Sequence, residues 1–176
     1  MSATQRDWLS AELLERELTA PFHRPVGTGR SYWGPGDVYT FLVTGAESGG
    51  RYFAMEALVP PRGGPPPHIH HNEEETFYIV EGHCRIRLGD ETVLAGAGDF
   101  VNVPRGTVHS FHNAGTEMMR MILTFTPAGI ERFFEETLQP VLDARQDTPD
   151  DIDAIVSRYL EAAPRHALEF VADAAQ

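Results

Sequence analysis

The sequence predicts an all-β fold, a sandwich or barrel of short strands, with a short N-terminal helix and a C-terminal α-helical extension. Two observations carry this prediction. From residue 32 to residue 126, short apolar runs alternate with turns rich in Gly, Pro and Asp. After Pro127, apolar residues recur at the spacing of amphipathic helices. We expect the 176 residues to form one domain, with the barrel at about 32–126 and helices at 128–173.

The expected elements follow in order along the chain. Residues 7–18 carry a rough apolar stripe of helical period and predict the N-terminal helix, which Pro21 ends. A turn at 45–50 joins the first two strands, and the rigid segment 60–67, rich in Pro and Gly, cannot pair inside a sheet. The expected strands are residues 38–44, 51–59, 75–81, 85–88, 92–94, 100–103, 108–112 and 118–126.

Helices are expected after the strands. Ile130, Phe133, Phe134 and Leu138 share one helical face. Residues 148–151 combine a cap residue, a proline and two acids, which is a strong start signal for a second helix. Pro164 is expected to open a last short helix that contains Leu168, Phe170 and Val171.

Composition excludes several function classes. The net charge of −12 argues against nucleic-acid binding. All 14 basic residues are arginine, so a lysine Schiff base and a Walker A phosphate loop are both excluded. The single cysteine, Cys84, cannot form an internal disulfide, and no apolar run is long enough to span a membrane. We therefore expect a cytoplasmic protein without a membrane partner.

Three histidines and one glutamate form a candidate metal site. His68 and His70 are two positions apart, so an extended backbone points both imidazoles to the same face. Glu75 begins the next strand, and His109 heads another strand after a tight turn. Three imidazoles and one carboxylate suit one divalent Ni, Fe, Mn, Co, Cu or Zn ion, and they do not suit Ca or Mg. Open coordination positions would then accept a substrate or dioxygen.

Neighbouring residues were weighed as competing ligands. His71 and His112 have the wrong strand parity relative to His70 and His109, so we leave both out. Glu73 and Glu74 are interpreted as solvated, although either one is an alternative to Glu75 as the carboxylate ligand.

Two motifs in this region resemble those of the cupin superfamily. The first is His68-x-His70-x4-Glu75-x6-Gly82, and the second is Gly98-x5-Pro104-x-Gly106-x2-His109-x3-Asn113. One departure from the pattern is Arg62, which stands where a glycine usually precedes the first histidine by six positions. The resemblance implies a double-stranded β-helix, also called a cupin jelly-roll barrel, with the metal near one mouth, and it implies a homodimer.

Three flanking segments, Tyr39–Gly45, Glu56–Pro61 and Gly64–His71, extend the resemblance to bacterial cupins similar to quercetin 2,3-dioxygenase. This resemblance implies a dioxygenase that cleaves a flavonol or a related enolisable aromatic substrate with O2, with Glu75 as the base. The candidate substrate-binding residues are apolar or aromatic, although each also fits a filled barrel core: Tyr39, Phe41, Phe53, Phe77, Ile79, Phe111, Met121 and Leu123. The helices after Pro127 are either a lid over the mouth or a packed appendage without a gating role.

Two alternatives to the dioxygenase remain, because cupins carry many functions. The first is a metal-dependent isomerase, cyclase or lyase of a small metabolite or polyketide intermediate, in which Glu75 or Tyr78 moves a proton without oxygen. The second is a non-catalytic metal-binding cupin.

Overall fold

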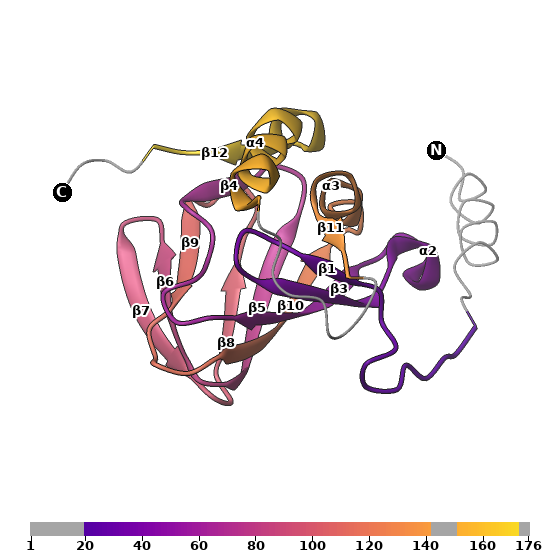
Figure 1. The fold of residues 1–176 in the computed structure, drawn as a ribbon, viewed down its shortest axis with the longest axis horizontal. Coiled ribbons are helices and arrows are strands. Elements are labelled where there is room, and N and C mark those ends of the chain that lie inside the picture. Colours follow the sequence, from indigo (N-terminus) through magenta and orange to yellow (C-terminus); the bar gives the residue numbers. More distant parts are fainter. Residues whose placement is uncertain (1–19, 142–150, 173–176) are drawn as a thin grey trace, which may run out of the picture.

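The computed structural model describes residues 20–141 and 151–172, and the expected N-terminal helix at 7–18 lies outside them. Two antiparallel sheets face each other, and the C-terminal helices lie across one end of them (Figure 1). The elements are β1 (Ser31–Trp33), β2 (Val38–Val43), α2 (Gly45–Ser48), β3 (Phe53–Val59), β4 (His68–His70), β5 (Glu74–Glu81), β6 (His83–Leu88), β7 (Glu91–Gly96), β8 (Phe100–Val103), β9 (His109–Asn113), β10 (Met119–Thr126), α3 (Glu131–Thr137), β11 (Gln139–Pro140), α4 (Ile152–Ala162), the 3-10 turn η2 (Ala163–His166) and β12 (Leu168–Phe170).

The strand order confirms the predicted all-β double-stranded β-helix with a C-terminal helical part. One sheet has the order β11-β1-β2-β3-β10-β5-β8, and the other has the order β12-β4-β9-β6-β7. Each predicted strand is present within about two residues of its expected bounds. The expected turn at 45–50 contains the one-turn helix α2, because Thr44 and Glu47 form a reciprocal capping box.

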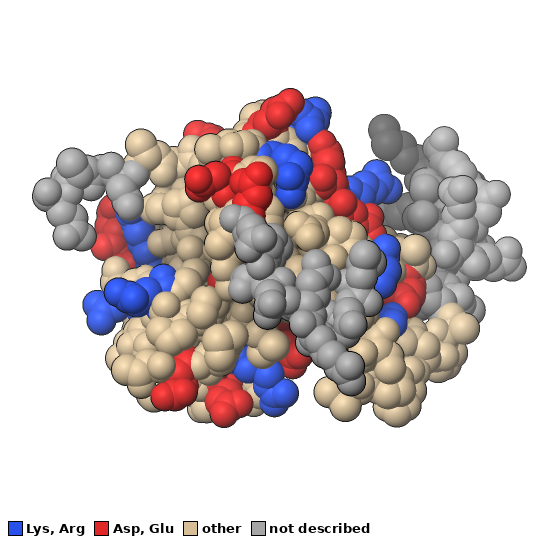
Figure 2. All heavy atoms as spheres, in the orientation of Figure 1, with Lys and Arg blue, Asp and Glu red and all other residues tan. Residues whose placement is uncertain are grey.

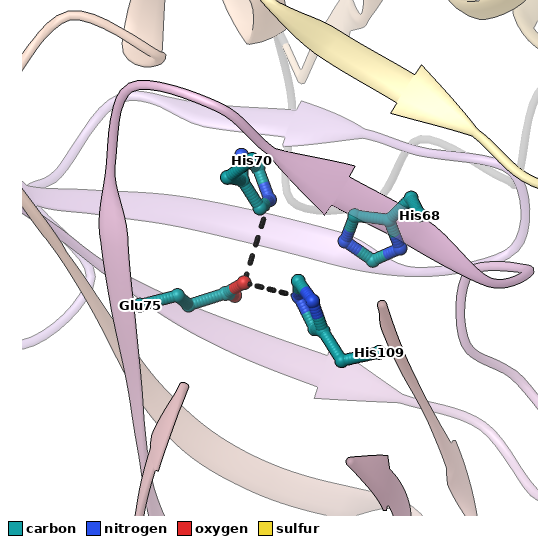
Figure 3. A group of neighbouring side chains, drawn as sticks. All are labelled: His68, His70, Glu75 and His109. Atoms are coloured by element: carbon teal, nitrogen blue, oxygen red, sulfur yellow. Dashed lines mark hydrogen bonds and ion pairs between the residues drawn. The ribbon is translucent and has the colours of Figure 1, made fainter. Parts of the chain in front are cut away.

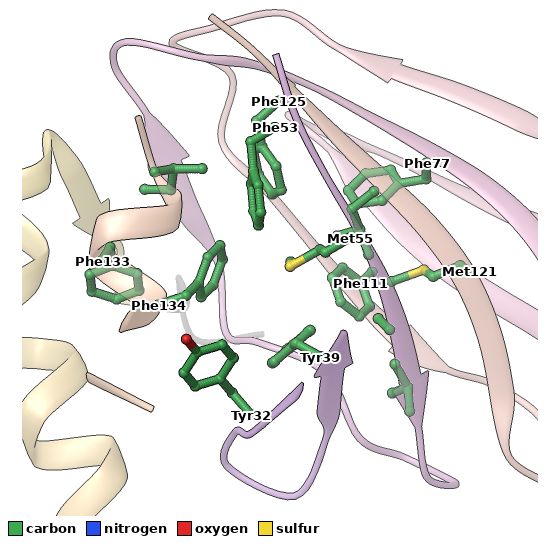
Figure 4. Close-up of a cluster of buried hydrophobic side chains, with 14 of the residues drawn as sticks. Tyr32, Tyr39, Phe53, Met55, Phe77, Phe111, Met121, Phe125, Phe133 and Phe134 are labelled. Carbon is green, nitrogen blue, oxygen red and sulfur yellow. The ribbon is translucent and has the colours of Figure 1, made fainter. Parts of the chain in front are cut away.

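The core lies between the two sheets and follows the period of two expected for strands. Along β5, Phe77 and Ile79 are buried while Tyr78 between them is exposed. Along β10, Met121 and Leu123 are buried by the same alternation. Figure 4 shows Phe77 and Met121 at one side of the buried cluster and Phe133 and Phe134 of α3 at its other side. The inward-facing side chains of these strands therefore fill the interior of the barrel.

The loop before β4 is held against the end of β9. Arg62 donates its backbone N–H to the carbonyl of Asn113, and the Asn113 N–H donates to the carbonyl of Gly63. Arg62 has a φ of 69°, a left-handed conformation that favours glycine, which explains why glycine is usual at this position. At Gly64 a Cβ would lie 2.1 Å from the carbonyl oxygen of Phe111. The Pro- and Gly-rich loop therefore fixes where His68 enters β4.

The segment after Pro164 corrects the prediction of a last short helix. The chain makes the 3-10 turn η2, passes Ala167 in a left-handed conformation, and then forms strand β12. Residues Leu168 to Phe170 pair in antiparallel register with His70 to His68. The reason is that β4 would otherwise present an unpaired edge, and β12 satisfies its backbone groups. The C-terminal segment thus covers the strand that carries two of the predicted ligands.

Helices α3 and α4 pack over the same end of the barrel. The buried Glu131 carboxylate accepts hydrogen bonds from the backbone N–H groups of Gly45 and Gly129, which fixes the start of α3. The rings of Phe133 on α3 and Tyr159 on α4 meet edge to face, with centroids 4.6 Å apart. Asp151 caps α4 by accepting a hydrogen bond from the Ala154 N–H, whereas the start signal placed the cap at Thr148. Residues 148–150 lie outside the described part.

On the face drawn in Figure 2, basic side chains are scattered among acidic ones and do not gather into one area. Among the helices that the structure describes, none combines the length and the apolar character needed to cross a bilayer.

Candidate metal centre

The four predicted ligands converge between the two sheets. His68 and His70 come from β4, His109 from β9 and Glu75 from β5, so both sheets contribute (Figure 3). Their donor atoms all lie within 4.8 Å of one another, and all four residues are buried. Such a cluster of imidazoles and one carboxylate can hold a divalent transition metal ion.

Strand parity separates these ligands from their neighbours, as predicted. His71 follows His70 directly, yet its side chain is 49% exposed and pairs with Glu169 at 2.9 Å. His112 is also exposed, although it lies on the same strand as His109. Alternation along each strand therefore decides which histidine faces the centre.

Hydrogen bonds at the far side of two rings fix which nitrogen faces the centre. His68 Nδ1 lies 2.9 Å from the carbonyl oxygen of Pro66, and His109 Nδ1 lies 2.9 Å from that of Thr107. A carbonyl can only accept, so each Nδ1 carries its proton and donates it. This arrangement leaves Nε2 for the metal, and it is the usual way in which ligand imidazoles are oriented.

Glu75 lies at the centre of the cluster. Its Oε2 is 2.8 Å from His109 Nε2 and 3.4 Å from His70 Nε2. The dashed lines in Figure 3 mark these two interactions. A divalent ion fits here in place of the proton that His109 Nε2 shares with Glu75, because a cation satisfies the same lone pairs.

Burial and neighbouring charges shift the pKa values of the three ligand histidines. Burial, followed by the nearby charge of His109, lowers the pKa of His68 to about 3. Burial likewise holds the pKa of His70 well below its usual value. For His109, burial pulls the pKa down, but the hydrogen bond and the charge of Glu75 outweigh it and the net direction is upward. His68 and His70 are therefore neutral at physiological pH, which is the form that binds a metal.

Glu73 is the functional residue that the sequence interpretation missed. We expected a solvated side chain, but Glu73 is only 4% exposed. Its Oε2 lies 3.8 Å from His70 Nδ1, and neither atom has a hydrogen-bond partner. Burial raises the pKa of Glu73 to about 7. The i, i+3 spacing from His70 was the available signal, and it places a carboxylate behind the His70 ring. From there a hydrogen bond can orient the ring once the two atoms move closer than 3.8 Å.

We predict that Glu73→Gln weakens metal binding by about 10- to 100-fold, because a second carboxylate behind a ligand histidine typically has this effect. The measurement is a competition titration of cobalt(II) or zinc(II) against a chelator of known affinity. Glu74→Gln is the matched control, since Glu74 is only partly buried and is not one of the clustered ligands. Equal metal affinities for Glu73→Gln and wild type would rule out this role.

A small cavity adjoins the metal cluster. It has a volume of about 40 Å³ and includes His68, His70 and Glu75 in its wall. Tyr39, Phe111 and Leu123 are the predicted substrate-binding residues that also line it. The other predicted substrate-binding residues lie in the packed core and do not border this cavity: Phe41, Phe53, Phe77, Ile79 and Met121.

The C-terminal part supplies much of the remaining wall. Phe133 and Phe134 come from α3, Tyr159 from α4, and Leu168 and Phe170 from β12. The sequence predicted these residues within helices and left open whether the helices form a lid over the mouth or a packed appendage, since nothing in the local pattern shows where a helix docks. The C-terminal elements therefore form the cover of the cavity.

Tyr78 does not face the site, which corrects its suggested role as a proton donor or acceptor. It is 47% exposed and pairs with Phe100 on the outer face of the sheet. Tyr78 alternates with Phe77 and Ile79, so it has the opposite parity to Glu75.

Comparisons with known proteins agree with this fold. Residues 55–125 match the family model described as a cupin domain. A predicted oxalate decarboxylase from Thermotoga maritima is 18% identical, with a TM-score of 0.56 over 61% of this chain and 99% of that chain. An RmlC-like cupin from Shewanella frigidimarina is 20% identical, with a TM-score of 0.54 over 65% of this chain and 99% of that chain. At these identities the likeness to solved structures shows the fold alone.

One curated relative adds sequence similarity. An uncharacterized protein of Streptomyces coelicolor is 36% identical over 53 residues, which is 30% of this chain. The match spans 50% of the length of that relative. Residues 55–125 thus resemble a cupin domain in sequence, and the solved structures share the fold.

Proposed function

We propose that this protein is a metal-dependent dioxygenase that acts on a flavonol or a related enolisable aromatic compound. The observation that carries the proposal is the position of Glu75, whose Oε2 contacts His109 and His70 at the wall of an aromatic cavity. A carboxylate in this place can both bind a metal and accept a proton from a substrate. The surrounding phenylalanines and tyrosines suit a flat apolar ring.

Glu75 is the base of the proposed reaction. The enolic hydroxyl of the substrate gives its proton to Glu75 Oε2, which lies at the ligand cluster, 2.8 Å from His109 Nε2. His68, His70, His109 and Glu75 would hold a divalent ion, which would supply Lewis acidity toward the substrate oxygen. The apolar wall excludes water, which strengthens the charge interactions inside the site.

The cover has to open for such a substrate. The cavity of about 40 Å³ holds only water-sized molecules, whereas ligand pockets typically measure about 300–1,000 Å³. Its lid-side wall comes from α3, α4 and β12, which follow the barrel in the chain. We propose that these elements shift outward when the substrate enters, so that they act as a lid.

The small cavity favours one alternative. A metal-dependent isomerase, cyclase or lyase of a small metabolite needs less space and uses the same carboxylate as its base. Dioxygen separates the two functions, because only the dioxygenase consumes it.

The test is turnover of quercetin by the metal-loaded protein with and without oxygen. The proposal predicts loss of the flavonol absorbance in air, with matching oxygen uptake, and no loss under nitrogen. Turnover that continues at the same rate under nitrogen would establish the alternative. Complete inactivity toward flavonols in air would reject the proposed substrate class.

A further inference from the structure

A second cavity lies beside the metal-side cavity and opens at the edge of α4. Its volume is about 100 Å³. The two cavities share four wall residues, which are Tyr39, Pro65, Tyr159 and Phe170. The remaining wall of the outer cavity is mostly apolar: Pro35, Gly64, Pro66, Val156 and Leu160, together with Asp37. The shared side chains separate the two spaces, so one molecule reaches both when the cover opens and these side chains move apart.

Asp37 is an unexpected charge in this apolar wall. It is only 2% exposed, and a backbone bond from the Gly34 N–H to its carbonyl holds the turn between β1 and β2. Its Oδ2 accepts a hydrogen bond from the Tyr39 hydroxyl at 2.8 Å. Its Oδ1 is buried without any hydrogen-bond partner. Burial raises the pKa of Asp37 to about 6. Keeping this carboxylate ionised in the interior therefore lowers the stability of the folded protein.

Tyr159 brings a second unpartnered polar atom to the same cavity. Its ring is fixed against Phe133, yet its hydroxyl is buried and makes no hydrogen bond. Tyr159 and Asp37 both contribute to the wall of this cavity. Two residues of this cavity wall therefore each have a buried polar atom without a partner among the described residues, whereas nearly all buried polar groups in proteins are paired.

We propose that the outer cavity binds a phenolic hydroxyl of the substrate. The hydroxyl donates to Asp37 Oδ1 and accepts from the Tyr159 hydroxyl, so it satisfies both groups at once. The ring that bears it lies between the prolines of the 60–67 loop and Phe170, and the rest of the molecule extends past Tyr39 toward the metal. The inference rests on the proposed function only in the choice of a hydroxylated aromatic ligand.

The exposed end of α4 fits this role. Val156 and Leu160 line the outer cavity while remaining 38% and 54% exposed. Apolar side chains at a cavity rim lose contact with water when an aromatic ring covers them. Asp37 and Tyr159 then determine which ring is accepted, because a ring without a hydroxyl leaves both groups buried and unpaired.

The test is equilibrium binding of two flavonols to the full chain under nitrogen, where no oxygen-dependent turnover takes place. The first is 3-hydroxyflavone, whose only hydroxyl is the enolic one, and the second is kaempferol, which adds phenolic hydroxyls. Wild type is expected to bind kaempferol about tenfold more tightly or better, which corresponds to a hydrogen bond with a charged group. Asp37→Asn and Tyr159→Phe are each expected to reduce this preference to less than threefold.

Neither substitution is expected to prevent the protein from folding. Asn at position 37 retains an acceptor for Tyr39 and removes a buried charge, and Tyr159→Phe removes a single oxygen atom. Tyr78→Phe is the matched control, because Tyr78 lies exposed on the outer face, and it should keep the wild-type preference. The proposal is overturned if wild type shows no preference, binds neither flavonol, or if the preference survives both substitutions. These are binding results, so they remain separate from turnover, which tests the proposed function.

Discussion

Glu75→Gln is expected to lower turnover by about 10²- to 10⁴-fold, which is the usual contribution of a positioned general base. Gln keeps the size of the side chain and one oxygen that can face the metal, but its amide cannot take a proton at neutral pH. Glu75 Oε2 lies 2.8 Å from His109 Nε2 and 3.4 Å from His70 Nε2. Among the described residues, Glu75 is the one carboxylate in the ligand cluster. The measurement is steady-state turnover, with metal content determined on the same samples.

The control for this prediction is Glu74→Gln, the same change one residue earlier on β5. Glu74 has the opposite parity and pairs with Thr126 at the end of β10, so its variant should retain wild-type turnover. If Glu75→Gln turned over at the wild-type rate while fully loaded with metal, Glu75 would not be the base.

His109→Ala is expected to abolish the stabilisation that metal gives to the fold. At a free metal concentration of 100 times Kd, a single site adds about 2.7 kcal/mol to the free energy of unfolding. His109 supplies one of four donors and also holds Glu75, so its removal leaves a buried carboxylate without its closest partner. Thermal or denaturant unfolding with and without added metal measures the difference.

His112→Ala is the matched control for His109→Ala. His112 lies on the same strand but is exposed, so metal should stabilise this variant as much as wild type. Equal metal-dependent stabilisation of His109→Ala would remove His109 from the proposed ligand set.

The sequence predicted the parts of the site that depend on local geometry. His68 and His70 share a face because strand side chains alternate, and the same rule excluded His71. The jelly-roll arrangement that brings Glu75 beside them from the other sheet was implied by the resemblance to the cupin motifs. The metal cluster and the barrel could therefore be predicted without knowing any long-range contact.

The remaining parts depend on how distant segments dock. β12 forms because the edge of β4 is available, and no pattern in residues 164–171 distinguishes that strand from a helix. Glu73 is buried because the chain folds back behind His70, and Asp37 becomes part of a cavity only when α4 brings Tyr159 beside it. Homodimer formation stays a prediction from the resemblance.

Metal content after loading and gel filtration tests the central claim most directly. The account predicts one divalent transition metal ion per chain in wild type, measured by elemental analysis against protein concentration. A variant with both His68→Ala and His109→Ala should retain less than a tenth of that amount. A wild-type chain that binds no stoichiometric metal, or a double variant that keeps the full amount, would contradict the assignment of His68, His70, Glu75 and His109 as a metal centre.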